Sequence, residues 1–166
     1  MATKNVQTHR DAHEAWNARE FDAMVDRMAS SITYVDHARG LTIRTRDDYK
    51  RWVEEWAQVF SNGKVVDAKY TDGGNTVVAR FTARGTNDGS FGPFSPTGRE
   101  MRFDVCEILE FDDQGKIVGG DAYYDQFSIL TQLGHVEAPA AAAETAVAPG
   151  HRCLPNERRP RQAQLP

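Results

Sequence analysis

From residue 64 onward the chain alternates apolar and polar residues in four successive segments, and this period of two limits the possible folds more than any other feature. The segments are KVVDAKYTD, NTVVARFTARG, EMRFDVCEILEFD and KIVGGDAYYD. Alternation is typical of strands that bury one face. The connections DGGN and DDQG are hairpin signals, and the longer TNDGSFGPFSPTG joins the middle pair. We therefore expect an antiparallel meander.

The chain before residue 64 follows a helical period instead. THRDAHEAWNA and EFDAMVDRMAS predict two consecutive helices, and apolar residues from Tyr49 to Phe60 predict a third, which Thr45 and Asp48 begin with a pattern like a capping box. SITYVDH and LTIR predict short strands, and QFSILTQLG predicts a closing helix. Helices followed by a meander indicate an α+β domain, with three N-terminal helices covering one face of a curved sheet of four to six strands.

The composition indicates one ordinary soluble domain and disfavours several classes of partner. The chain has 166 residues, 40% of them hydrophobic, and a formal net charge of -4. Because nucleic-acid binders usually carry a basic surplus, we expect no nucleic-acid partner. The sequence has no apolar run of the roughly 20 residues that a membrane span needs. Its first residues, MATKNVQTHRD, lack the apolar segment of a secretory signal. We therefore expect a cytoplasmic protein with no membrane contact.

The composition changes near residue 136, and this change marks the end of the predicted domain. VEAPAAAAETAVAPGHRCLPNERRPRQAQLP is rich in Ala, Pro and Arg and contains no Phe, Tyr or Trp. Such a segment buries too little apolar surface to offset its ordering entropy. We expect residues 1–135 to form the domain and residues 136–166 to be a disordered tail.

Glu107 is the first candidate for chemistry because it interrupts an apolar row. Its neighbours on the same face of the predicted strand are Phe103, Val105, Leu109 and Phe111. Burial raises the pKa of a carboxyl group, so we expect Glu107 to be protonated and to donate a hydrogen bond or a proton. Alternatively, Glu107 reaches the domain edge or forms a structural pair with an Arg or Lys.

Asp36 is the second candidate. It shares a face with Ile32 and Tyr34, so the apolar side of that strand ends in a carboxylate. Two carboxyl groups in different environments can divide the roles of base and acid. The alternative is that Asp36, followed by HARG, only starts a turn.

Three histidines form the third group of candidates. His9 and His13 are one helical turn apart, and His37 follows Asp36 directly. With His37 or a carboxylate they could bind zinc, although HRDAHE is not the HExxH motif of zinc proteases. The preferred interpretation gives His13 or His37 a role in proton transfer at a pocket, with no metal and no cofactor.

A pocket is expected on the apolar face of the sheet. Tyr hydroxyls can bind a polar ligand in an apolar cavity, and glycines in a strand leave room for a ligand or a bulge. Alternation places Asp121 on the opposite face unless a bulge reverses its direction. The expected lining residues are Trp16, Tyr34, Trp56, Phe60, Phe81, Val105, Gly120, Asp121, Ala122 and Tyr124.

Three features of the sequence together resemble a known family. They are the order of the elements, the segment YVDHARG before a capped helix, and the segment CEILEFDDQGKIVGGDAYYDQFSILTQLG. Residues 5–135 resemble the SnoaL-like polyketide cyclases and the ketosteroid isomerases of the nuclear transport factor 2-like superfamily. The resemblance implies a cone-shaped roll around an apolar pocket, a homodimer packed through the outer sheet face, and catalysis without cofactor or metal. It also implies that Asp36 is the catalytic base and Glu107 a protonated acid. The isomerases place a Tyr on the first helix, where this chain has Ala12 and His13.

These observations predict a cofactor-independent enzyme that cyclises or isomerises a hydrophobic, carbonyl-bearing small molecule such as a polyketide. Asp36 would remove a proton beside the carbonyl and Glu107 would stabilise the enolate oxygen, with His13 or His37 and Tyr124 assisting. Epoxide hydrolysis or dehydration would use similar groups. A small-molecule binding or assembly domain without catalysis, and a metal enzyme built on His9, His13 and His37, are the alternatives.

Overall fold

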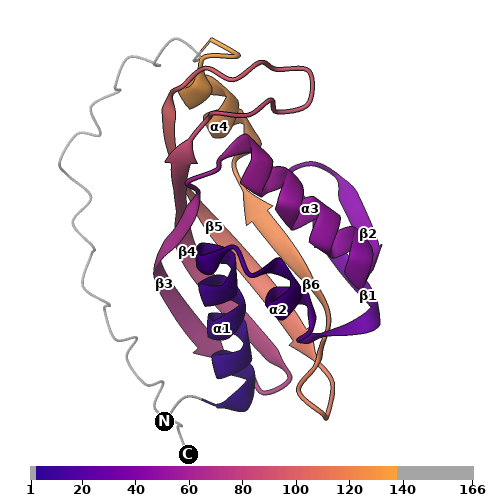
Figure 1. Cartoon of the computed structure of the whole chain (residues 1–166). Helices are drawn as coiled ribbons and strands as arrows, with labels where there is room; N and C mark the ends of the chain where they lie inside the picture. The colour runs from indigo at the N-terminus through magenta and orange to yellow at the C-terminus, as the bar shows by residue number, and fades with distance from the viewer. Residues whose placement is uncertain (1–2, 138–166) are drawn as a thin grey trace, which may run out of the picture.

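The computed structural model describes residues 3–137, which form a single curved sheet with helices against its concave face (Figure 1). The mixed α+β class predicted from the sequence is confirmed. The predicted tail lies outside the described residues, except for residues 136 and 137. Within the described part of the chain, no helix combines the length and the apolar character needed to cross a membrane.

Six strands make up the sheet, in the order β2-β1-β6-β5-β4-β3. Every neighbouring pair is antiparallel except β1 and β6, which run parallel. This parallel pair brings the N-terminal strands beside the last strand of the meander, so segments far apart in the sequence share one sheet. The strands are β1 (Met28–Asp36), β2 (Leu41–Thr45), β3 (Lys64–Asp72), β4 (Thr76–Thr86), β5 (Glu100–Phe111) and β6 (Ile117–Tyr124).

The two longest helices begin where the sequence supplies capping side chains. Thr3 caps α1 (Lys4–Ala18), and Thr45 caps α3 (Arg46–Val59) by accepting a hydrogen bond from the Asp48 backbone N–H at 3.1 Å. The second helix, α2 (Phe21–Val25), is shorter than EFDAMVDRMAS suggested. The residues expected to form its last turn instead form the start of β1. There, Met28 is buried and pairs with Ile117 of β6. Tertiary pairing overrides local helix propensity there.

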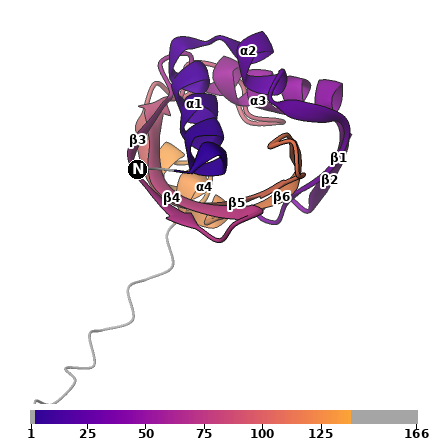
Figure 2. The same cartoon turned by 90° about the horizontal axis from the view of Figure 1, so that it is seen from below.

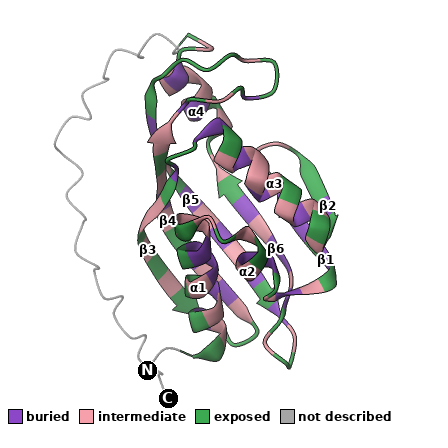
Figure 3. Cartoon of the chain, viewed as in Figure 1, coloured by how far each residue is buried: buried purple, intermediate pink, exposed green. Residues whose placement is uncertain are grey.

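The sheet curves strongly, and α1, α2 and α3 lie across its open side (Figure 2). Burial follows the same arrangement, since the residues between the helices and the sheet are buried while most outward-facing strand residues are half-buried or exposed (Figure 3). One apolar cluster joins α1, α2, α3 and β1, and a second joins the end of α3 to α4 (Gln126–Leu133) and Met101. The concave face therefore holds the core and the candidate site.

Candidate active site

A single row of paired residues crosses the concave face of the sheet and carries its polar side chains. Tyr70 pairs with Ala79, Ala79 with Glu107, Glu107 with Ala122, and Ala122 with Asp36. Paired positions point to the same face, so all five side chains face the helices. The two alanines separate the polar residues and leave space between them. Two strand spacings place the Cα atoms of Glu107 and Asp36 about 10 Å apart.

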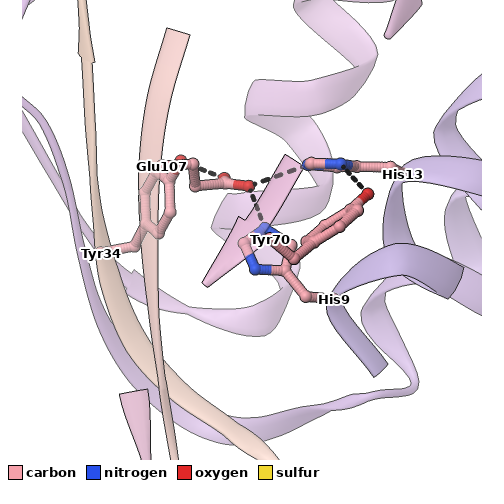
Figure 4. Close-up of polar contacts among 5 residues, drawn as sticks. All are labelled: His9, His13, Tyr34, Tyr70 and Glu107. Atoms are coloured by element: carbon pink, nitrogen blue, oxygen red, sulfur yellow. Dashed lines mark hydrogen bonds and ion pairs between the residues drawn. The ribbon is translucent and has the colours of Figure 1, made fainter. Parts of the chain in front are cut away.

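Glu107 lies at the centre of a hydrogen-bonded network that draws on α1, β1 and β5 (Figure 4). Its Oε2 atom lies 2.8 Å from His9 Nε2 and 3.1 Å from His13 Nε2. The Tyr34 hydroxyl donates to Oε1 at 2.7 Å. Only 7% of Glu107 is exposed, and Tyr34 and His9 are fully buried. Three donors therefore surround a carboxyl group that has almost no contact with water.

The network determines the protonation of Glu107, and the expected neutral acid is wrong. Burial alone would raise the pKa of this carboxyl group, but hydrogen bonds and charge from His13 and His9 outweigh it, so the pKa is lowered below its ordinary value. Glu107 is therefore an ionised acceptor at neutral pH. The predicted structural alternative named Arg or Lys as its partner, whereas the structure supplies two histidines.

The two histidines share a face of α1 because they are four residues apart. Burial lowers the pKa of His9 below its ordinary value, and the hydrogen bond and charge of Glu107 oppose this effect. His9 Nδ1 has no hydrogen-bond partner among the described residues. His13 Nδ1 lies 2.8 Å from the Tyr70 hydroxyl, so His13 connects Tyr70 to Glu107.

The two tyrosines of the network keep their protons. Burial raises the pKa of Tyr34 well above its ordinary value, and the charge of Glu107 raises it further. Burial raises the pKa of Tyr70 to about 12. Sequence reasoning did not identify Tyr70 as a site residue. The signal that could have found it is the strand register, which places Tyr70 two strands from Glu107 on the same face.

Asp36 is fully buried at the end of the same row. Its Oδ2 atom accepts hydrogen bonds from the Tyr124 hydroxyl at 2.8 Å and from Trp52 Nε1 at 3.1 Å. Its Oδ1 atom accepts one from the Arg39 backbone N–H at 3.1 Å, which is the turn contact considered as the alternative role. Asp36 is not among the residues that line the cavity, whereas Tyr124 and Trp52 are.

The cavity between the helices and the sheet is almost entirely apolar and aromatic. It contains about 720 Å³ of unfilled space, part of which is open to solvent. Glu107 and His13 reach its wall, and Tyr49, Trp52 and Phe103 line it although the sequence did not assign them to the pocket. The expected lining residues that do line it are Trp16, Tyr34, Trp56, Phe60, Phe81, Val105, Ala122 and Tyr124.

Gly120 and Asp121 lie outside this cavity, which corrects their expected place. A Cβ atom on Gly120 would lie 2.2 Å from the Ile108 carbonyl oxygen, so the glycine permits close strand contact rather than widening the pocket. Asp121 faces the outer side of the sheet, where its Oδ1 atom lies 2.6 Å from His37 Nε2. His37 stacks on Tyr123 at 4.3 Å and belongs to that exposed pair. The structure thus brings His9 and His13, but not His37, to Glu107.

His9, His13 and Glu107 are also the group of described residues whose donor atoms could hold a metal ion. One ligand atom from each lies within 4.8 Å of the others, and all three residues are buried. Asp36 and His37 do not belong to this group. The arrangement can accept or donate a proton at a buried carboxylate and imidazole, or bind a cation between them.

Comparison with known proteins gives a family and a fold. The family model described as SnoaL-like polyketide cyclase matches residues 6–133. A comparison with curated proteins finds no match. Among solved structures, the chain is similar to AclR, a proposed hydroxylase from Streptomyces galilaeus, with a TM-score of 0.72 and 19% identity over 82% of this chain and 85% of that one.

Two further solved structures have the same architecture. A proposed SnoaL-like polyketide cyclase from Jannaschia sp. CCS1 has a TM-score of 0.73 at 19% identity, covering 82% of this chain and 94% of its own. A protein with a ketosteroid isomerase-like fold from Catenulispora acidiphila has a TM-score of 0.63 at 24% identity, covering 74% and 88%. At these identities the similarity establishes the fold alone.

Proposed function

Since this chain belongs to the SnoaL-like polyketide cyclase family, which supports a cyclase-type function, we propose that it is a cofactor-independent acid–base enzyme. Its substrate would be a hydrophobic, carbonyl-bearing small molecule of the polyketide class, which it cyclises or isomerises through an enolate. One observation carries this proposal: an ionised carboxylate, Glu107, reaches the wall of an aromatic cavity with an imidazole N–H beside it.

Glu107 would act as the base in this reaction. An ionised carboxylate in an apolar cavity can accept a proton from the carbon next to a carbonyl group. In the free protein, the hydrogen bonds from His9 and His13 stabilise the charge and weaken the base. A substrate whose carbonyl oxygen takes the hydrogen bond of His13 would remove part of that stabilisation. The pKa of Glu107 would then rise toward the value that its burial favours.

His13 would stabilise the enolate oxygen. The Tyr70 hydroxyl, 2.8 Å from His13 Nδ1, would donate to that atom and leave the imidazole proton on Nε2, the atom that faces Glu107. As the proton moves from substrate carbon to Glu107, the same N–H can donate to the developing negative charge. Positioned acid–base groups contribute roughly 100- to 10,000-fold in rate, and one oxyanion donor about 100- to 1,000-fold.

Asp36 would act as a positioning residue rather than as the first base. It holds the Tyr124 hydroxyl and the Trp52 indole, which both line the cavity, while its own carboxylate stays behind them. This assignment differs from the role implied by the family resemblance. Replacing Asp36 by Asn would lower substrate affinity more than turnover, because the change acts through the cavity wall.

Exchange of deuterium into a cyclic ketone, followed by mass spectrometry, tests the proposal without knowledge of the natural substrate. We expect Glu107→Gln to slow the exchange roughly 100- to 10,000-fold relative to the wild type. His37→Gln is the matched control, since His37 lies on the outer face and its replacement should leave the rate unchanged. Equal exchange rates for the wild type and folded Glu107→Gln would contradict the proposed role.

A non-catalytic binding domain is the second candidate, and the full set of donors to Glu107 favours it. Every oxygen of this carboxylate already accepts a hydrogen bond, as expected for a group that only supports a cavity. The exchange assay separates the two functions. A binding domain would hold the ketone in the wild type without exchanging its protons.

A further inference from the structure

We propose that His9, His13 and Glu107 form a binding site for a divalent transition-metal ion, with zinc as the ion that suits this set of ligands. The three donor atoms are His9 Nε2, His13 Nε2 and Glu107 Oε2, and they converge from α1 and β5 on one buried point (Figure 4). This site lies beyond the proposed acid–base function, which needs no metal.

The ligand types and their placement favour zinc. Two histidines one helical turn apart, both presenting Nε2, with a glutamate from another element, give the His₂Glu set found in zinc enzymes. The two N–O distances are 2.8 and 3.1 Å. Tetrahedral ligands of zinc lie roughly 3.3 Å apart, given metal–ligand bonds of about 2.0 Å. All three atoms lie within 4.8 Å of one another, so the ion is admitted when the carboxylate moves slightly outward and the two imidazole rings turn toward each other.

Two of the three ligands also have an outer hydrogen-bond partner. His13 Nδ1 contacts the Tyr70 hydroxyl, and Glu107 Oε1 accepts a hydrogen bond from Tyr34, so the ring and the carboxylate are held in the required orientation. His9 Nδ1 has no such partner among the described residues. An ion bound to Glu107 would lie beside the aromatic cavity, which provides both a path of entry and space for a fourth ligand such as water.

Zinc and the acid–base reaction would exclude each other. A bound ion takes the lone pair of Glu107 that would accept the proton. It also takes the lone pair of His13 Nε2, so the imidazole proton lies on Nδ1 and is donated to the Tyr70 oxygen. Metal loading should therefore inhibit ketone exchange. The binding itself is measured without any substrate, so failure of the proposed enzyme function would leave this inference standing, and the reverse also holds.

The test uses the full chain after dialysis against a chelator, with zinc as the only ligand. We expect calorimetry to show one zinc ion per chain. Folded His9→Gln and Glu107→Gln variants should lose this binding, and Tyr70→Phe should weaken it by about 10- to 100-fold through the loss of an outer partner. His37→Gln should bind like the wild type. His151→Ala/Cys153→Ser should also retain binding, which separates the site from the donors in the C-terminal segment.

X-ray absorption of the zinc-loaded wild type gives an answer that does not depend on folding of the variants. Two imidazole groups and oxygen ligands would support the site. Sulfur in the coordination shell, no stoichiometric zinc binding by the wild type, or loss of binding in His151→Ala/Cys153→Ser would each overturn it. Undiminished binding by folded Glu107→Gln would overturn it as well.

Discussion

Glu107 shows what a single residue can and cannot reveal in the sequence. Its burial follows from the alternation of β5, since both neighbours on its face are apolar. Its charge does not follow, because the hydrogen bonds that control it come from His9 and His13, which lie 98 and 94 residues away. Desolvation and donation shift the pKa in opposite directions, and only the fold determines which effect is larger.

Replacing Glu107 by Gln should destabilise the folded protein by about 2–3 kcal/mol at neutral pH. The amide retains one acceptor but loses the charge that His9 and His13 share, and its NH₂ group faces their N–H donors. Guanidinium chloride unfolding would measure the difference, with exposed Glu110→Gln on the same strand as the control. A stability equal to that of the control would contradict a buried ionised carboxylate.

The same residue predicts a dependence on pH. In the folded protein the pKa of Glu107 is below its ordinary value of 4.5, so ionisation contributes stability above that pH. The contribution should decline as the pH falls below about 4.5, and the difference between wild type and Glu107→Gln should shrink with it. The groups facing this carboxylate are His9, His13 and Tyr34. A difference that grows on acidification would indicate a neutral Glu107.

At the scale of helices and strands, local sequence patterns predicted which elements form more accurately than the residues at which they begin and end. The period-two segments became β3 to β6, and the capped apolar stripe became α3. The end of α2 was not predictable, because Met28 joins β1 only through its pairing with β6, a strand from the opposite end of the domain. Asp121 followed the alternation of β6, and the Gly119–Gly120 pair did not reverse it.

The start of α3 offers a test at this scale. Thr45→Ala removes the side chain that accepts a hydrogen bond from Asp48 N–H, and we expect a loss of about 1 kcal/mol in the free energy of unfolding. Thr45→Ser keeps the hydroxyl and should retain most of that stability. Chemical denaturation measures both variants. An equal loss in both would show that the threonine methyl group, and not the cap, stabilises the helix.

At the scale of the whole molecule, the site exists only because distant segments meet on one curved surface. The row from Tyr70 to Asp36 uses five neighbouring strands, and α1 adds the two histidines. Strand order and the parallel contact of β1 with β6 are global properties, so the sequence indicated Asp36, Glu107, His13 and Tyr124 but not which of them bond to one another. The aromatic wall was largely predictable because each of its residues already lay on an apolar face.

The outer face of the sheet concerns the assembly of the molecule. Tyr123 is 43% exposed there, and the half-buried Val78, Cys106 and Ile108 lie on the same face of adjacent strands. Apolar and aromatic side chains at the centre of a sheet face are typical of an interface between subunits. We propose that two copies of the chain pack together through this face.

Light scattering on the full chain should accordingly give twice the mass of 18.6 kDa. Tyr123→Asp places a carboxylate within the proposed interface and should shift the protein to the monomer, because burying a charge is costly. Phe127→Asp is the matched control, since Phe127 is 49% exposed but belongs to α4 rather than to the sheet. A monomeric wild type would contradict the proposed dimer. Dissociation by Phe127→Asp but not by Tyr123→Asp would place the contact between subunits at α4.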